Sequence, residues 1–190
     1  ALINNSGKQV TKVLARELDL SFVQENKNKL WIFGNFSSIP HKKRLLVAKE
    51  VANYSIIEYD YKICHYRSLE LHMQTRNEEC RCEETLEGKI NQIFYSKAQH
   101  VWFMSEEQMA IFLMKIGKLK ESNCSVLSSV FEKRYLDKMK NLSGNKKNNR
   151  YAIINSKRWI KGVDSSIKYA KENNLSYDLI QSLEYDELLK

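Results

Sequence analysis

KLWIFGNFSSIPHKKRLLVAKEVANYSIIEY, residues 29–59, predicts a strand, a helix and a second strand in succession. The apolar runs 29–33 and 55–59 are typical of buried strands. Between them, residues 42–54 have helical spacing, with inward positions expected at Leu45, Leu46, Ala48, Val51 and Ala52. Two strands joined by a helix form a βαβ unit, whose strands are parallel. This unit indicates the fold class.

The same alternation continues along the chain. Helices are expected at 88–97, 106–116 and 131–141, with strands at 100–104 and 125–127. Ser105 precedes the second of these helices and is a good N-cap residue. In the polar segment between the second strand and residue 88, the apolar residues show no clear helical or strand periodicity. The sequence therefore predicts an α/β protein with a Rossmann-like parallel sheet and helices on both faces.

A linker divides the predicted elements. Residues 143–149, SGNKKNN, lack apolar periodicity, which predicts a domain at 1–145 followed by a linker and new elements at 146–190. A strand is expected at 151–154, then a basic loop with Lys157, Arg158 and Lys161, then an amphipathic helix. One strand and one helix are too few for a domain, so the second part is expected to be truncated.

The composition of the chain argues against some classes of function. The 190 residues carry a net charge of +8 and are 43% hydrophobic, enough for one ordinary core. The basic residues are scattered, with denser runs only at 41–44 and 146–150, so nucleic acid is not the expected partner. No secretory signal or membrane-spanning run is found. The four cysteines are expected to be reduced thiols, and the expected location of the protein is the cytoplasm.

Several common enzyme motifs are absent from the sequence. The chain has no Gly-x-x-x-x-Gly-Lys-Ser/Thr loop, no Gly-x-Gly-x-x-Gly, no Gly-x-Ser-x-Gly and no His-Glu-x-x-His. The usual P-loop NTPase, dinucleotide, hydrolase and metalloprotease classes are therefore not indicated.

Candidate ligand-binding residues follow the predicted strands, where parallel sheets bind ligands. Gly34 and Asn35 follow the first strand and form either a ligand-contacting loop or a simple turn. Glu58, Asp60 and Lys62 alternate at the end of the second strand, which would place them on one face. Two carboxylates and an amine can tune a base or bind hydroxyls, or can form a salt-bridged strand end.

A cluster of metal-ligand residue types lies within nineteen residues. Cys64, His72, Cys80 and Cys82 offer three thiolates and one imidazole, a set that suits tetrahedral zinc. Cys-x-Cys is less specific than Cys-x-x-Cys, so free thiols are the alternative. A structural zinc ion is thus one hypothesis for this segment.

The order of the motifs IFGNF, IIEYDYKICHYR, HVWFMSEEQ, VLSSVF and WIKGVDSSIKYAKENN resembles a family 4 glycosyltransferase of the GT-B fold. The resemblance implies that residues 1–145 form the acceptor half of a two-domain enzyme and that 146–190 begin the donor domain. It implies transfer of a sugar from a nucleotide-sugar donor to a carbohydrate or other hydroxyl acceptor, with no cofactor needed for catalysis.

The resemblance also implies roles for individual residues. Glu58 and Asp60 would be catalytic, with Asp60 contacting the acceptor nucleophile. The expected substrate-binding residues are Gly34, Asn35, Lys62, Ser105, Glu106 and Lys161. Lys161 and Gly162 match the family's Lys-Gly pair at the donor diphosphate, whereas Asn155 and Ser156 replace its Gly-Arg turn. The family's paired glutamates lie beyond this chain, so the fragment is expected to be inactive alone.

A second class of function is also consistent with these residues. The chain could instead be a stand-alone basic α/β module that binds a nucleotide or nucleic acid and is stapled by zinc. If the chain is a truncated glycosyltransferase, the surface exposed by the truncation would allow a homodimer. Tryptophans 31, 102 and 159 are expected in core or interface packing rather than in sugar stacking.

Overall fold

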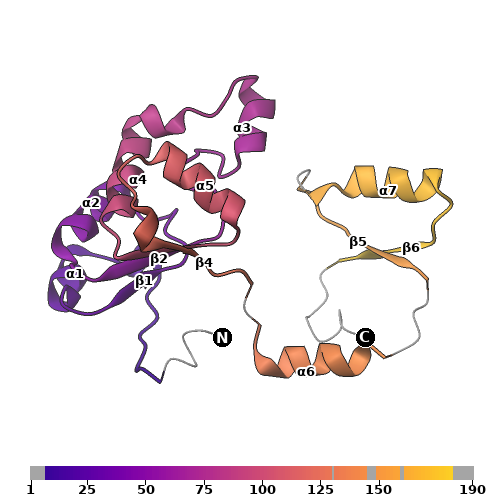
Figure 1. Cartoon of the computed structure of the whole chain (residues 1–190), viewed down its shortest axis with the longest axis horizontal. Helices are drawn as coiled ribbons and strands as arrows, with labels where there is room; N and C mark the ends of the chain where they lie inside the picture. The colour runs from indigo at the N-terminus through magenta and orange to yellow at the C-terminus, as the bar shows by residue number, and fades with distance from the viewer. Residues whose placement is uncertain (1–6, 130, 145–148, 159–160, 182–190) are drawn as a thin grey trace. The chain divides into compact units, whose positions relative to one another are not determined.

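The computed structural model describes residues 7–129, 131–144, 149–158 and 161–181 (Figure 1). The chain divides into two compact units, residues 1–130 and 131–190. The division thus falls before the 131–144 segment, whereas the sequence prediction placed the boundary after it.

The first unit contains a four-stranded parallel sheet in the order β1-β2-β3-β4. Its strands are Trp31–Phe33, Tyr54–Glu58, His100–Phe103 and Cys124–Val126. Ile56 lies between Phe33 and Val101 in the register. The α/β class and the Rossmann-like parallel sheet are therefore confirmed, and each of the four strands overlaps a predicted one.

Helices follow the strands in turn. The main helices of this unit are α1 (Leu20–Asn26), α2 (His41–Glu50), α3 (Leu69–Arg76), α4 (Leu86–Ser96) and α5 (Glu106–Lys115). Short 3₁₀ turns lie at η1 (Ala15–Glu17), η2 (Cys82–Glu84) and η3 (Glu121–Asn123). Ser105 caps α5 by accepting a hydrogen bond from the Gln108 amide at 3.2 Å, as expected for an N-cap.

The core lies between the sheet and the helices that follow its strands. Phe94 of α4 packs edge-on against Phe33 of β1, with centroids 5.2 Å apart, and Phe112 of α5 packs 5.0 Å from Phe103 of β3. Val47 of α2 belongs to the same buried cluster. Figure 1 shows these three helices together on one side of the sheet.

The order of the strands decides where their crossover helices lie. The strands follow each other across the sheet in sequence order, and successive right-handed crossovers in one direction place their helices on one face. On the other face, Ile32 of the edge strand β1 is 43% exposed, whereas Ile57 of the interior strand β2 is only 7% exposed. Both faces of β2 are therefore buried.

The inward face of α2 also differs from the prediction. Leu45 and Ala52 are exposed, whereas Val47 and Arg44 are buried. The Arg44 guanidinium is held by the Asn91 side chain and donates to a backbone carbonyl 2.9 Å away. Because these bonds satisfy the charge, an arginine occupies a position that hydrophobic periodicity would give to a leucine.

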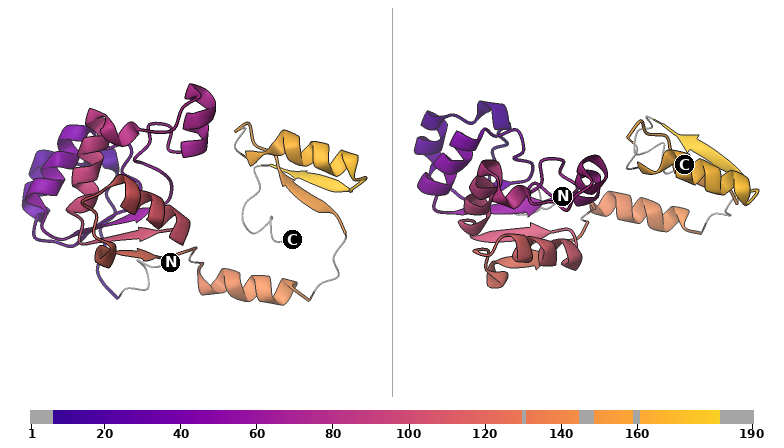
Figure 2. Two further views of the ribbon diagram at one scale, coloured as in Figure 1. Left: turned by 45° about the horizontal axis from the view of Figure 1, so that its top comes forward. Right: turned by 90° about the horizontal axis from the view of Figure 1, so that it is seen from above.

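The sequence predicted only part of the second unit. It contains α6 (Lys133–Leu142), β5 (Tyr151–Ile154), α7 (Val163–Glu172) and β6 (Tyr177–Ile180). The two strands are parallel, and α7 lies alongside them (Figure 2). The sequence predicted the first strand and both helices but not β6. Residue Trp159 and most of the proposed linker lie outside the described residues.

A close contact between α4 and η2 gives a direct test of the packing. A Cβ atom built at Gly88 would lie 2.0 Å from the Cys82 carbonyl oxygen and 2.6 Å from the Glu83 Cα. Both are backbone atoms that cannot move independently, so Gly88→Ala should lower the free energy of unfolding by about 2 kcal/mol or more in a denaturant titration. Gly117→Ala is the control, because no atom lies within 4 Å of its Cβ position. Equal stability of the two variants would contradict this packing.

Candidate metal centre

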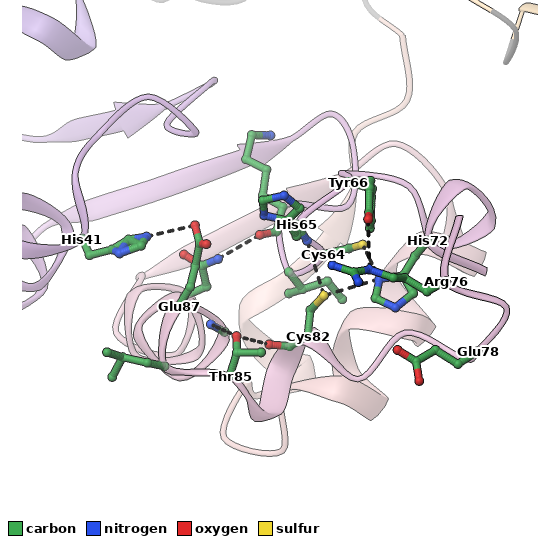
Figure 3. A pocket seen from close by; sticks show the side chains of 15 residues that line it. His41, Cys64, His65, Tyr66, His72, Arg76, Glu78, Cys82, Thr85 and Glu87 are labelled. Atoms are coloured by element: carbon green, nitrogen blue, oxygen red, sulfur yellow. Dashed lines mark hydrogen bonds and ion pairs between the residues drawn. The ribbon is translucent and has the colours of Figure 1, made fainter. Parts of the chain in front are cut away.

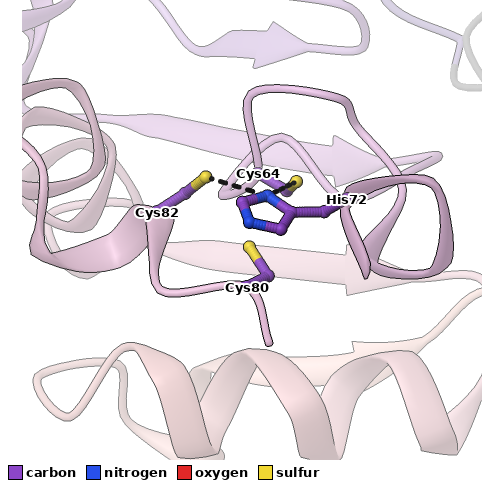
Figure 4. Close-up of side chains that lie close together, drawn as sticks. All are labelled: Cys64, His72, Cys80 and Cys82. Carbon is purple, nitrogen blue, oxygen red and sulfur yellow. Dashed lines mark hydrogen bonds between the residues drawn. The ribbon is translucent and has the colours of Figure 1, made fainter. Parts of the chain in front are cut away.

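The chain makes a long excursion between β2 and α4, at the carboxyl end of the sheet. Cys64 lies in the turns that follow β2, His72 lies on α3, Cys80 lies just before η2, and Cys82 is the first residue of η2. The fold brings these four side chains together, as the sequence pattern suggested. Their ligand atoms all lie within 4.8 Å of one another (Figure 4).

Two separations between ligand atoms match the edges of a tetrahedral metal site. The His72 Nδ1 atom lies 3.6 Å from the Cys64 Sγ and 3.5 Å from the Cys82 Sγ. Zinc–sulfur bonds of about 2.3 Å and zinc–nitrogen bonds of about 2.05 Å give a sulfur–nitrogen edge of about 3.6 Å in a tetrahedron. The four residues therefore could hold a metal ion with little rearrangement, and His72 would bind through Nδ1.

Local structure explains why His72 faces the cysteines. The Ser68 hydroxyl caps α3 by accepting from the Leu71 amide at 3.1 Å. Asn77 ends the helix in the left-handed region, with φ of 55°, and Asn tolerates this conformation better than most residues. The helix is short and capped at both ends. The chain can therefore return to Cys80 within three residues of Asn77.

Amide groups surround the sulfur atoms. The His65 amide donates to the Cys82 Sγ at 3.5 Å. Backbone amides of Tyr66 and Cys82 bond the sulfurs of Cys64 and Cys80, two positions earlier in each case. Amide donors stabilise thiolates, which are the metal-binding form of cysteine.

Burial favours the neutral thiols when no metal is bound. It raises the pKa of the Cys80 thiol to about 12 and also raises the pKa of Cys64. A metal ion would reverse this preference, because coordination deprotonates a thiol. The cluster is thus compatible both with neutral thiols and with a bound metal ion.

The second layer around the cluster is also ordered. The Tyr66 ring packs edge-on to the His72 imidazole at 5.4 Å, and its hydroxyl accepts from the Arg76 Nε at 3.1 Å. The Lys115 ammonium donates to the Cys80 carbonyl at 2.6 Å and pairs with Glu83 at 2.9 Å. These contacts fix the orientation of the imidazole and of the Cys80 backbone.

A cavity of about 550 Å³ adjoins the cluster. Figure 3 shows His41 and Glu87 at one end, Arg76 and Glu78 at the other, and Cys82 between them. His41 pairs with Glu87 at 2.9 Å. Cys82 is less buried than Cys64 and Cys80, so the cluster meets solvent on this side.

The three polar residues predicted after β2 also come together. The Lys62 ammonium lies 2.8 Å from a Glu58 oxygen and 2.9 Å from an Asp60 oxygen. Glu58 is fully buried, and Lys62 is only 5% exposed. This is the arrangement of a salt-bridged strand end, the alternative that the sequence left open.

The two carboxylates differ in their electrostatics. Burial raises the pKa of Glu58 to about 7, although Lys62 and the Tyr95 hydroxyl oppose the shift. Partial burial also acts to raise the pKa of Asp60, but hydrogen bonds from Arg67 and Lys62 outweigh it and lower that pKa. Asp60 therefore stays ionised and is a weak base, which does not favour it as a proton acceptor.

Sequence reasoning missed two partners of this network. Tyr95 of α4 donates its buried hydroxyl to Glu58, and Arg67 binds Asp60 through its Nε at 2.8 Å. No spacing signal points to Tyr95, which lies 37 residues from Glu58. Arg67 stands only seven residues from Asp60, and the turn between them brings the two side chains together.

The remaining predicted substrate-binding residues lie in two places. Four of them follow strands at the carboxyl end of the sheet, and one lies in the second unit. Gly34 and Asn35 follow β1, and the Asn35 side chain accepts from the Ser37 hydroxyl at 2.8 Å, which favours a simple turn. Ser105 and Glu106 begin α5 after β3. Lys161 precedes the N-cap of α7 in the second unit.

Comparisons with known proteins do not place the chain in a family. No family model, no curated protein and no solved structure matches it. The helices within the described ranges are all too short or too polar to cross a membrane.

The buried carboxyl gives a pH prediction. The pKa of Glu58 is about 7 in the folded chain against 4.5 in the unfolded one, so the folded state binds this proton more tightly. Its contribution is fully present below pH 4.5 and is lost as the pH rises through about 7. Relative to Glu58→Gln, the wild-type protein should lose at least about 1 kcal/mol of unfolding free energy between these limits. Glu25→Gln, at an exposed site, should follow the wild-type curve, and parallel curves for all three proteins would contradict the assignment.

Proposed function

We propose that this chain is a zinc-stapled α/β binding module, in which Cys64, His72, Cys80 and Cys82 hold one structural zinc ion. One observation carries the proposal: the four ligand atoms lie within 4.8 Å of one another, and two sulfur–nitrogen separations, of 3.5 and 3.6 Å, are close to the edge of about 3.6 Å in a zinc tetrahedron.

The donor set favours zinc over other metals. Three thiolates and one imidazole are soft and borderline ligands, which suit zinc and do not suit magnesium or calcium. None of the four side chains offers a carboxylate oxygen. The four cysteines of the chain are free thiols, so disulfides do not compete for these sulfurs.

A structural role fits better than a catalytic one. Four protein ligands complete a tetrahedron and leave no position for substrate or water. Part of the apolar surface near them is not covered: Met73 and Leu86 are 51% and 77% exposed. The metal would therefore join the turn after β2, helix α3 and the start of α4.

The stapled excursion lies where α/β proteins bind ligands. It follows β2 at the carboxyl end of the sheet and lines the 550 Å³ cavity together with α2 and α4. The zinc ion would hold one wall of this cavity in place. Residues from three separate segments could then present a constant surface to a ligand.

Metal analysis tests the zinc directly. The purified protein should contain about one equivalent of zinc, and a strong chelator should lower its melting temperature by about 10 °C or more, because the metal binds the folded state. His72→Ala should abolish zinc retention. His65→Ala is the matched control, since this neighbouring histidine lies outside the cluster and should keep the metal.

Cysteine variants separate ligand loss from a general effect of losing a thiol. Cys80→Ser should behave like His72→Ala, whereas Cys124→Ser should retain zinc, because Cys124 is not in the cluster. The proposal fails if the wild-type protein binds no zinc when refolded with the metal, or if His72→Ala binds it as tightly as the wild type does.

The glycosyltransferase hypothesis is kept as a second candidate because of the second unit. Its parallel β5-α7-β6 arrangement is a second βαβ unit, as the start of a donor domain would be. Gly162 adopts the left-handed region, with φ of 63°, at the N-cap of α7. Lys161 stands next to this helix start, where an ammonium and free amides favour an anion.

Nucleotide binding tests this second candidate. Uridine diphosphate should bind the chain, and Lys161→Ala should weaken its affinity about tenfold, the usual cost of one charge-assisted bond. Lys168→Ala is the control: Lys168 lies on the exposed side of α7, 3.8 Å from Glu172. Equal affinities of both variants and the wild type, or no binding at all, would remove the donor-site hypothesis.

A further inference from the structure

The three sulfurs of the Cys/His cluster (Cys64, His72, Cys80 and Cys82) differ in their access to solvent. Cys64 and Cys80 are only 3% and 7% exposed. Cys82 is less buried and lines the 550 Å³ cavity (Figure 3). Cys82 is therefore the cluster thiol that a small molecule entering from this cavity meets first.

Cys80 is well placed to form a bond with Cys82. The ligand atoms of the cluster all lie within 4.8 Å of one another, and the Cys80 sulfur interacts with that of Cys82 (Figure 4). Arg81, between the two cysteines, has φ of −118° and ψ of 30°, which turns the chain at this point. Residues joined by such a turn have Cα atoms about 6 Å apart, within the range of about 4.4–6.8 Å that a disulfide spans.

Cys64 is a less suitable partner for Cys82. Its sulfur donates to the Ser68 carbonyl at 3.5 Å and accepts from the Tyr66 amide, so it is held within its own turn. A bond between Cys80 and Cys82 also closes a much shorter loop than a bond from Cys64 would, and less chain entropy is lost when it forms.

We propose that Cys82 is a site of oxidation by hydrogen peroxide, and that Cys80 then forms a disulfide with it that expels the zinc ion. The disulfide rests on the geometry of the sulfurs alone. The expulsion of zinc rests on the proposed function.

The reaction has two steps. The Cys82 thiolate attacks one peroxide oxygen, so that an S–O bond forms, the O–O bond breaks and hydroxide leaves. The Cys80 thiolate then attacks the Cys82 sulfur, so that the S–S bond forms, the S–O bond breaks and a second hydroxide leaves. Each hydroxide takes up a proton. Two thiols and one hydrogen peroxide thus give one disulfide and two water molecules, and the two electrons that the sulfurs lose reduce the peroxide.

The disulfide would remove two of the four metal ligands. Cys64 and His72 remain, and two ligands do not complete the tetrahedron of a structural zinc site. The bond between Cys80 and Cys82 joins only neighbours in the chain, so it does not replace the link that the metal makes between segments. A thiol reductant would restore both thiols and allow zinc to bind again.

Peptide mapping of the full chain after peroxide treatment tests the proposal. Trypsin cuts after Arg81, so it separates Cys80, in peptide 77–81, from Cys82, in peptide 82–89. After brief exposure of the zinc-loaded protein to about tenfold excess hydrogen peroxide and alkylation of the remaining thiols, these two peptides should be joined by a disulfide. A chromogenic indicator should detect release of about one equivalent of zinc, which should rebind after reduction with dithiothreitol.

Two variants identify the roles of the thiols. In Cys80→Ser, the sulfenic acid at Cys82 has lost its partner, so dimedone should label peptide 82–89 and no disulfide should join it to peptide 77–81. Cys124→Ser is the matched control, because Cys124 lies outside the cluster. This variant should give the same joined peptides as the wild type.

The possible failures are distinguishable. Alkylation of all the cluster cysteines after peroxide treatment would overturn the oxidation, and a disulfide to peptide 63–67, which contains Cys64, would overturn the pairing. Zinc that stays bound while peptides 77–81 and 82–89 are joined would overturn the expulsion. A protein that holds no zinc before treatment would instead contradict the proposed function, and the same two peptides would still confirm or overturn the disulfide.

Discussion

One imidazole and three sulfurs meet where the excursion between β2 and α4 closes on itself. Cys64 and Cys82 approach His72 from different segments of the chain, and their sulfur atoms lie 3.6 and 3.5 Å from the same ring nitrogen. Hydrophobic burial supplies only part of this closure, because Ile63 is buried but Met73 is 51% exposed. A metal ion would supply a strong, directional interaction in its place.

Contacts from the cluster reach the sheet through α4. Gly88 lets α4 lie directly against the Cys82 backbone, and Asn91, one turn later, donates to the Lys62 carbonyl at 2.8 Å. Lys62 in turn neutralises the buried Glu58 at the end of β2. The Cys/His cluster and the buried ion pair are therefore parts of one layer at the carboxyl end of the sheet. A substitution in the Cys/His cluster should therefore affect the Glu58–Lys62 ion pair through α4, and a substitution in the ion pair should affect the cluster.

Much of the first unit could be predicted because its strands are short apolar runs and its main helices are periodic. Helix α3 could not, since only His72 of its eight residues is buried and the helix is held by caps. Likewise, the inward face of α2 was misjudged because the buried Arg44 is satisfied by Asn91, 47 residues away. Residue types in one short segment pointed to the Cys/His cluster, whose four ligand atoms the fold brings within 4.8 Å of one another. The hydrogen bond from Tyr95 to Glu58 depends on the packing of α4, and no local sequence pattern predicts it.

X-ray absorption spectroscopy at the zinc edge tests the central claim most directly, because it reports the ligands themselves. The account predicts a first shell of three sulfur atoms at about 2.3 Å and one nitrogen atom at about 2.0 Å, the values expected for a Cys₃His site. It also predicts that the nitrogen contribution comes from an imidazole. A first shell made only of oxygen and nitrogen, or one with fewer than three sulfurs, would contradict it.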